Sequence, residues 1–261
     1  MKPLHLLAVC TAALAGAANA AAPVCSASSP AFTTALVELY TSEGCDSCPP
    51  ADHWLSSLFA RGFRPEQVVP LALHVDYWDY IGWKDPYAKS EFARRQHRLL
   101  QTGRAPLIYT PQVVLQGRDF RRWGTDEFAR TVSRINSTPA RARIALSLQS
   151  MTKDAANVAL AAELLDPAGR KDAALYVAAY ENRLASEVSA GENRGRRLEH
   201  DFVVREWIGP IGFGHGPKIE EKRSLPLLPD AVPAHSGVAA FVQDRSTGEV
   251  LQALMLPACR G

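Results

Sequence analysis

The sequence lacks a strongly basic region. Its 29 lysine and arginine residues nearly balance its 27 aspartate and glutamate residues, which leaves a formal net charge of +2 at pH 7 with histidine neutral. The arginine pairs at residues 94–95 and 196–197 are typical of solvated surfaces. Nucleic-acid binding needs a basic patch or stripe. We therefore expect no nucleic-acid partner.

After its N-terminus the sequence also lacks an apolar run long enough to span a membrane, which takes about 20 residues. The N-terminal run from Leu4 to Gly16 is shorter than that. Lys2 precedes it, and Ala-Asn-Ala at residues 18–20 follows it as a small-residue cleavage sequence. These features are typical of a secretory signal peptide. We therefore expect residues 1–20 to be removed, leaving an exported protein, periplasmic or secreted, with no transmembrane segment.

Cysteines are few, and removal of the signal leaves Cys25, Cys45, Cys48 and Cys259. Disulfides persist in the oxidising compartments that exported proteins reach. Four cysteines allow three pairings. We favour Cys45 with Cys48, and Cys25 with Cys259 as a structural disulfide. The second bond would join the two ends of the mature chain and contribute up to about 5 kcal/mol on the loop-entropy model.

Cys45 and Cys48 lie where a strand gives way to a helix. The apolar run at residues 35–40 predicts a buried strand before them. Apolar residues then recur at helical spacing, at Ala51, Trp54, Leu55, Leu58 and Phe59. The unpaired N–H groups and the dipole at a helix N-terminus stabilise a thiolate. The sequence therefore predicts a thiol–disulfide exchange site that needs no cofactor, with Cys45 and Cys48 as its catalytic residues.

Two other interpretations of the cysteine pair stay open. The pair can be a purely structural disulfide, and the neighbouring carboxylates of Glu43 and Asp46 disfavour a thiolate. Alternatively, Cys45 and Cys48 can bind Cu(I) or Zn(II) together with His74, as in a metal chaperone, because two thiolates and an imidazole suit these metals. His74 ends an apolar strand, however, where a hydrogen-bonded core histidine is the more common case.

The segment from residue 31 to 138 predicts an α/β domain. Pro70 lies in its second strand, and because proline cannot donate to a ladder, we expect that strand at a sheet edge. Strands and helices alternate, then two strands follow each other, which is the minimal thioredoxin architecture. The expected strands are 34–40, 67–75, 112–115 and one near Phe120, and the expected helices are 46–60, 86–100 and one capped by Thr125.

From residue 139 to 261 the pattern changes to short apolar or alternating runs without convincing helices. Several short strands separated by turns predict a β-sandwich-like domain. Residues 208–236 are rich in glycine and proline and predict a long irregular excursion. The fold class is thus an α/β thioredoxin-like domain followed by a β-sandwich-like domain. The expected strands are 141–148, 157–164, 175–180, 198–207, 238–243 and 250–256.

An aromatic and acidic loop follows the second strand at residues 76–86. It leaves that strand at the carboxyl end, where Cys45 also lies and where α/β sheets tend to bind ligands. The loop either lines a substrate groove or packs its aromatic rings onto the end of the sheet. The candidate groove residues are Asp76, Trp78, Asp79 and Trp83.

Six passages of the chain, residues 37–52, 74–80, 82–86, 109–112, 191–195 and 200–201, form a combined pattern. Together they resemble an exported thioredoxin-like family, the domain-of-unknown-function family 1223. The resemblance covers most of the mature chain and implies a thioredoxin-like first domain and a β-rich second one. It implies no settled substrate. The polar residues Glu192, Asn193 and His200 are expected on surface turns and strands.

Thioredoxin-like proteins in general imply a role for each cysteine. By this resemblance Cys45 is the exposed nucleophile and Cys48 resolves the mixed disulfide. The resemblance also implies a cis-proline opposite the pair at Pro111, which adds Thr110 and Pro111 to the substrate groove. The expected partners are cysteine-containing exported proteins or a redox partner. Two prolines directly after the pair, at residues 49–50, depart from ordinary thioredoxins.

Overall fold

The computed structural model describes residues 25–152, 154–168 and 171–257. The predicted signal peptide at residues 1–20 lies outside these ranges, and so does Cys259, the predicted partner of Cys25. Both of these predictions stay predictions. Within the described ranges, no helix is long and apolar enough to cross a membrane.

In the first half of the chain, strands and helices follow each other in the order that the sequence predicts. Parallel β3 and antiparallel β4 flank β2, and β4 pairs with β5. The carboxyl ends of β2 and β3 therefore lie at the same edge of the sheet. The elements are β2 (Ala35–Thr41), α1 (Pro49–Ser56), β3 (Val68–His74), the short 3-10 helix η1 (Asp79–Ile81), α2 (Ser90–Gln101), β4 (Gln112–Leu115), β5 (Arg118–Asp119) and α3 (Asp126–Asn136).

Local sequence explains where these elements begin. All seven residues of β2 are buried, as expected for a continuous apolar run covered on both faces. Helix α1 begins at Pro49 and not at residue 46, because proline suits the first helical turn. Helix α3 begins as predicted: the Thr125 hydroxyl accepts a hydrogen bond from the Glu127 N–H at 3.3 Å.

The prediction that Pro70 marks an edge strand is wrong. Strand β11 (Val203–Gly212) continues the sheet beyond β3, and the described register pairs Val203 with Ala72. The Ala72 N–H donates to the Phe202 carbonyl at 2.8 Å. The backbone nitrogen of Pro70 faces the same side two residues earlier, where no described register pair with β11 is formed. The missing N–H of proline therefore costs no ladder bond.

The second half of the chain is almost entirely β-structure. It adds four strands to the sheet of the first half, whose order becomes β14-β13-β8-β11-β3-β2-β4-β5. It also forms a second sheet of order β1-β6-β7-β12, which β1 (Cys25–Ser28) joins from the beginning of the described chain. Besides β11, the strands of the second half are β6 (Ala142–Met151), β7 (Ala155–Leu164), β8 (Ala173–Glu181), β9 (Leu184–Glu187), β10 (Arg197–His200), β12 (Lys218–Pro226), β13 (Ser236–Asp244) and β14 (Val250–Pro257), with a 3-10 turn η2 (Pro233–His235).

The predicted irregular excursion at residues 208–236 is also wrong. Strand β11 extends to Gly212, and β12 occupies residues 218–226. Strand β12 pairs only with β7 among the described strands, so it forms an edge of the second sheet. Its charged residues 220–223 are half-buried or exposed. Charged residues on an edge strand protect the sheet against further pairing. In β12 they also interrupt the apolar pattern from which strands are predicted, so the sequence did not indicate this strand.

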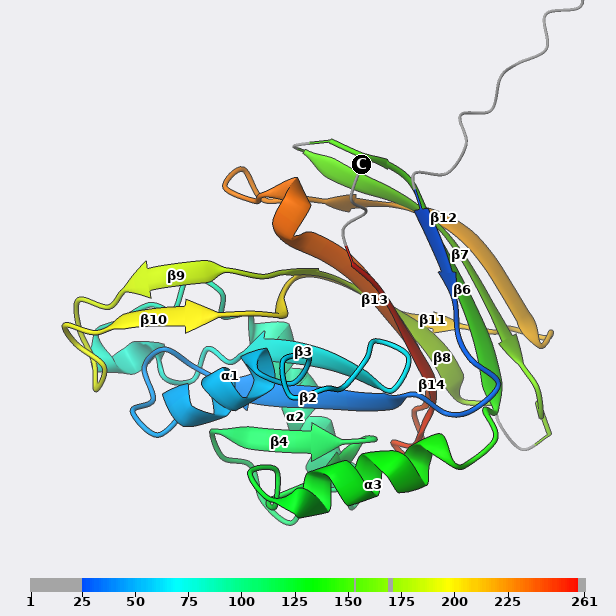
Figure 1. The fold of residues 1–261 in the computed structure, drawn as a ribbon, viewed down its shortest axis with the longest axis horizontal. Helices are drawn as coiled ribbons and strands as arrows, with labels where there is room; N and C mark the ends of the chain where they lie inside the picture. Colours follow the sequence, from blue (N-terminus) through cyan, green and yellow to red (C-terminus); the bar gives the residue numbers. More distant parts are fainter. Residues whose placement is uncertain (1–24, 153, 169–170, 258–261) are drawn as a thin grey trace, which may run out of the picture.

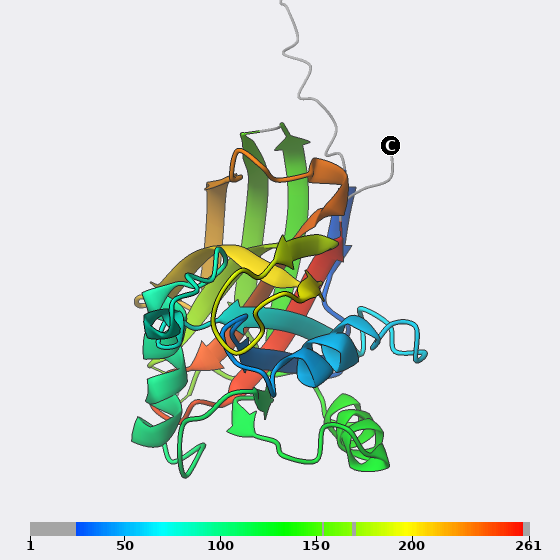
Figure 2. The same ribbon diagram turned by 90° about the vertical axis from the view of Figure 1, so that its left-hand side faces the viewer.

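The two sheets pack face to face (Figure 1), and helices lie on both faces of the larger sheet (Figure 2). Glu38 of β2 contacts Arg95 of α2, whereas Thr41, on the opposite face of β2, contacts Asp52 of α1.

Strand β8 shows how one strand serves two cores: Tyr176 and Tyr180 belong to the core that includes the helices, whereas Leu175 and Val177 belong to the core between the sheets. The large sheet thus runs across the predicted domain boundary near residue 139. The division into two domains stays a prediction.

Candidate functional site

Cys45 and Cys48 form a disulfide, as the sequence predicts, with 5.5 Å between their Cα atoms. Cys48 is the N-cap residue of α1. Its carbonyl accepts the N–H groups of Ala51 and Asp52 at 2.9 and 3.2 Å. The disulfide therefore lies between the carboxyl end of β2 and the first turn of a helix. That turn offers no unpaired N–H group, because its first two residues are prolines and the next two N–H groups are bonded to the Cys48 carbonyl.

Both cysteines are buried, with exposed fractions of 1% for Cys45 and 0% for Cys48. The expectation that Cys45 is exposed is therefore wrong. One reason is the close packing of the 76–86 loop: a Cβ added at Gly44 would lie 3.0 Å from the Trp78 Cβ and 3.3 Å from the Ile81 Cδ1. The cysteine loop, residues 42–48, and the aromatic loop, residues 76–86, are therefore in direct contact.

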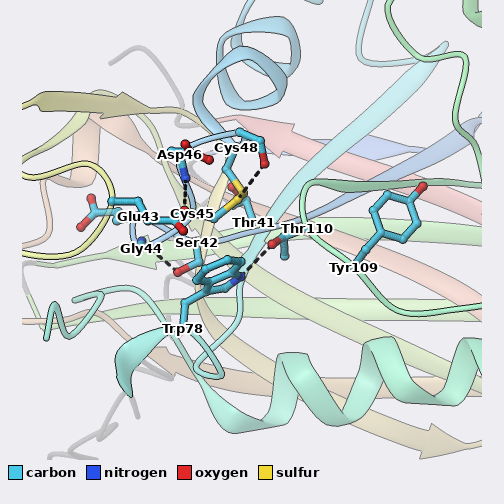
Figure 3. Close-up of a disulfide and its surroundings, with 12 residues drawn as sticks. Thr41, Ser42, Glu43, Gly44, Cys45, Asp46, Cys48, Trp78, Tyr109 and Thr110 are labelled. Carbon is cyan, nitrogen blue, oxygen red and sulfur yellow. Dashed lines mark hydrogen bonds between the residues drawn. A yellow bond between two sulfur atoms is a disulfide. The ribbon is translucent and has the colours of Figure 1, made fainter. Parts of the chain in front are cut away.

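Two tryptophans of the aromatic loop point at the disulfide region. The Trp78 Nε1 donates to the Thr110 hydroxyl at 2.8 Å, beside the disulfide (Figure 3). The Trp83 Nε1 donates to Glu43 Oε2 at 2.8 Å. The Thr110–Pro111 peptide bond is cis, as the resemblance implied. Gln112 pairs with Tyr40 at the end of β2, which places Pro111 at the same edge of the sheet as the cysteines.

The two aspartates predicted for the groove take other positions. Asp76 lines a shallow hollow along the exposed face of α2. Asp79 accepts the backbone N–H of Asp85 at 3.3 Å, and burial raises the pKa of its carboxyl. The structure thus brings Trp78, Trp83 and Thr110 to the disulfide region, whereas Asp76 faces α2.

A buried histidine–aspartate pair lies at the end of β3. His74 Nδ1 and Asp85 Oδ2 are 2.7 Å apart, and both side chains are fully buried. Burial lowers the pKa of His74, but Asp85 outweighs it and the net pKa is raised. Burial raises the pKa of Asp85, but His74 and the N–H groups of Glu43 and Tyr87 outweigh it and the net pKa is lowered. His74 is thus a hydrogen-bonded core residue.

A second buried pair joins the two halves of the chain. His200 Nε2 lies 3.0 Å from Glu43 Oε1, and the His200 ring packs edge-on against the His74 ring at 4.9 Å. Asp52 accepts the Thr41 hydroxyl at 3.1 Å, and burial raises the pKa of Asp52. Sequence reasoning placed His200 on the surface and gave Asp52 no role. Only the resemblance of residues 200–201 drew attention to this histidine.

The connection between β9 and β10, which belongs to the second half of the chain, contacts the loop around Cys45. Asn193 is fully buried, and its Nδ2 donates to the carbonyls of Glu43 and Cys45 at 2.8 and 2.9 Å. Glu192 Oε2 accepts the Asp46 N–H at 3.0 Å. The expectation of surface positions is thus wrong for Asn193 and His200. Figures 1 and 2 show the β9–β10 hairpin beside α1, although the two are far apart in the sequence.

The alternative metal site finds no support in the described ranges. No three histidine, cysteine, aspartate or glutamate side chains of these residues are arranged as metal ligands. Cys45 and Cys48 are bonded to each other, and His74 pairs with Asp85.

Comparisons with known proteins place this geometry among relatives of unassigned activity. A family model described as a protein of unknown function, DUF1223, matches residues 36–243. A crystal structure from Agrobacterium tumefaciens is 25% identical, with a TM-score of 0.60, over 88% of this chain and 96% of that one. HBP35 of Porphyromonas gingivalis is 15% identical, with a TM-score of 0.62, over 89% of this chain and 79% of its own, which is a likeness of fold alone. No curated protein matches the chain.

Proposed function

Because the chain belongs to the DUF1223 family of proteins of unknown function, its activity has to be inferred from its own site, and we propose that it is a thiol–disulfide oxidoreductase. The observation that carries the proposal is the Cys45–Cys48 disulfide at the N-terminus of α1. A thiolate released there is stabilised by the positive end of the helix dipole. Its substrates are cysteine-containing exported proteins or a redox partner.

The exchange proceeds in two balanced steps. The thiolate of a partner attacks the Cys45 sulfur, a mixed disulfide forms, and the Cys45–Cys48 bond breaks to release Cys48 as a thiolate. A second thiolate of the partner then attacks the partner sulfur that is bonded to Cys45. A disulfide forms within the partner, and Cys45 is released as a thiolate. The partner leaves oxidised by two electrons, and the protein is left reduced with two thiols. In reverse, Cys48 resolves the mixed disulfide on Cys45.

The arrangement of the elements supports the fold class that goes with this activity. The strand order β3-β2-β4-β5 with α1 and α2 as connections supports a thioredoxin-like first domain over residues 31–138. The two packed sheets support a sandwich-like character for residues 139–261. The predicted signal at residues 1–20 supports an exported, periplasmic or secreted protein, in which such a disulfide persists.

Burial of the sulfurs favours a second candidate, a structural disulfide. Cys45 and Cys48 are 1% and 0% exposed, so a partner thiol cannot reach them in this arrangement. A structural bridge holds the same geometry without exchange. The two candidates differ in one measurable property, which is whether the bond can be reduced while the protein stays folded.

A redox titration of the folded protein tests the proposal. The chain without residues 1–20 is equilibrated in glutathione or dithiothreitol buffers, and its thiols are alkylated and located by mass spectrometry. We expect a Cys45–Cys48 couple with a potential above about −300 mV, since structural disulfides typically lie below that value. Cys48→Ala should trap partners on Cys45, and Cys45→Ala should trap none there. A bond that stays oxidised until the protein unfolds would establish the structural candidate instead.

A further inference from the structure

The connection between β9 and β10, residues 188–196, lies over the cysteine loop, and we call it the cover segment. Its central residue Asn193 has no exposed surface, and its side-chain amide donates to the carbonyls on both sides of Gly44. Glu192 adds a charge-assisted hydrogen bond to the Asp46 N–H. Three backbone positions around Cys45, those of Glu43, Cys45 and Asp46, are therefore held by two side chains from the other half of the chain.

The cover segment is also closed on itself. The Val188 N–H donates to the Arg196 carbonyl at 3.0 Å, and the Gly195 N–H donates to the Val188 carbonyl at 2.7 Å. The Asn193 carbonyl accepts the Arg196 N–H at 3.0 Å, and the Asn193 side-chain oxygen accepts from the Arg196 guanidinium at 2.9 Å. These bonds keep the segment's shape without help from the cysteine loop. It can therefore leave the loop as one unit.

The contact between the cover segment and the cysteine region is small. Besides the bonds from residues 192 and 193, Gly191 approaches Ile81: a Cβ added at Gly191 would lie 3.0 Å from the Ile81 Cδ1. Ile81 in turn lies against Gly44. A Cβ at Gly191 would also lie 3.5 Å from the Trp83 Cβ, and a Cβ at Gly82 would lie 3.7 Å from the Ala190 Cβ. A contact made of a few hydrogen bonds and a few side chains opens at lower free energy than a large apolar interface. When it opens, the carbonyls of Glu43 and Cys45 become free acceptors.

We propose that the cover segment gates the disulfide and that Asn193 is the positioning residue of the gate. With Asn193 in place, the loop around Cys45 is fixed and the sulfurs are closed to solvent. With the segment displaced, Cys45 becomes reachable and its flanking carbonyls can receive the main chain of a partner polypeptide. The proposal rests on the proposed function for its biological meaning, but the gate itself can be measured separately.

The test is the rate at which dithiothreitol reduces the folded protein. The two thiols of dithiothreitol lose two electrons and two protons and close to a cyclic disulfide, while Cys45 and Cys48 become thiols. We expect Asn193→Ala to be reduced at least tenfold faster than the parent. Glu192→Gln, which keeps an oxygen acceptor but loses its charge, should be reduced about threefold faster. This second variant still decides the question if Asn193→Ala does not fold.

The chain offers a matched control in Asn136. Its side-chain amide also donates to two backbone carbonyls, those of Thr33 and Gln67 at 2.9 and 3.1 Å, but at the other end of β2. Asn136→Ala should be reduced within twofold of the parent rate. Reduction through the gate should also be insensitive to about 1 M urea, because local opening exposes little surface, whereas global unfolding exposes much.

Equal rates for Asn193→Ala and the parent, or equal acceleration by Asn136→Ala, would overturn the gate. A rate that rises steeply with urea in the parent and in Asn193→Ala would also overturn it. The proposed function fails separately: if Asn193→Ala accelerates reduction but Cys48→Ala traps no partner, the gate holds and the oxidoreductase does not. If the couple titrates and the rates are equal, the oxidoreductase holds and the gate does not.

Discussion

At the scale of residues, the site depends on ionisable side chains that are buried in pairs. His74 pairs with Asp85, and His200 pairs with Glu43, all four with exposed fractions of 3% or less. Breaking a buried ion pair by removing one partner typically costs about 3–5 kcal/mol, because the remaining charge is left without compensation. The pairs therefore hold the carboxyl ends of β2 and β3 together below the cysteines.

The His74–Asp85 pair predicts a specific pH dependence of stability. The folded pKa of His74 is raised, so its contribution is complete below the unfolded pKa of about 6.5 and is lost as the pH rises through the folded pKa. The folded pKa of Asp85 is lowered, so its contribution is complete above an unfolded pKa of about 4 and is lost as the pH falls through the folded pKa. The pair should stabilise most between about pH 4 and 6.5.

Urea unfolding from pH 3 to 9 measures this contribution as the difference between the parent and Asp85→Asn. The difference removes the titrations that the two proteins share. It should reach about 3–5 kcal/mol within the window and shrink on both sides of it. Glu187→Gln breaks a surface pair with Arg197 and should cost at most about 1 kcal/mol. A difference that is constant from pH 3 to 9 would contradict the prediction.

At the scale of elements, the cysteine loop and the aromatic loop are packed as closely as a glycine allows. A methyl group at position 44 would meet the Trp78 Cβ at 3.0 Å. That atom is attached to the backbone of the loop and cannot turn away as the end of a flexible side chain can. Gly44→Ala should therefore push the aromatic loop outward and destabilise the protein by about 1–3 kcal/mol.

The matched control for this prediction is Gly124→Ala, since a Cβ at Gly124 has no atom of the described structure within 4 Å. It should leave the free energy of unfolding unchanged or raise it slightly, because alanine restricts the unfolded chain. Tryptophan fluorescence of the folded variants adds a second measurement, since only Gly44→Ala should alter the surroundings of Trp78. If both variants have the same stability, the two loops are not in tight contact.

Local sequence predicted the elements whose burial follows from their own pattern. The apolar run of β2, the order of elements from β2 to α3, and the Thr125 cap were predicted correctly. The disulfide between Cys45 and Cys48 was also predicted correctly. Each of these features depends on residues close together in the chain.

Features that depend on distant contacts could not be predicted in this way. Asn193 and His200 are polar residues in a turn and a short strand, and their burial comes from partners 148 to 157 residues away. Cys45 is likewise buried in a region that distant segments contact: Asn193 bonds to its carbonyl, and Trp78 and Ile81 lie against Gly44. Strand β12 was missed because an edge strand carries charges that remove the apolar signal.

At the scale of the whole molecule, the large sheet joins the two halves, and Arg95 is one of the side chains that contact both of them. Arg95 of α2 donates to Glu38 of β2 at 2.6 Å and to Gln243 of β13 at 3.1 Å. Its guanidinium lies 4.9–5.1 Å from the ring centroids of Tyr176, Trp207 and Phe241. Burial lowers the pKa of Arg95, but Glu38 outweighs it and the net pKa is raised. A fixed positive charge thus connects both halves.

This connection predicts that the protein unfolds as one unit. Because β11 pairs with β3 and the sheet has no break at residue 139, the two halves should lose structure in a single transition. Arg95→Lys keeps the charge but loses the planar fork and its ring contacts, and it should lower the stability of both halves together by about 2–4 kcal/mol. Arg98→Lys, on the exposed face of the same helix, should change stability by less than about 0.5 kcal/mol.

Two probes of unfolding distinguish one transition from two. Near-ultraviolet circular dichroism follows the aromatic side chains, and hydrogen exchange assigns protection separately to β2 of the first half and to β7 of the second sheet. For the parent, both probes should give the same midpoint, and Arg95→Lys should move both midpoints by the same amount. If β7 kept its protection after β2 had lost it, the halves would be independent domains. The shared sheet would then be a contact between two folding units and not the core of one.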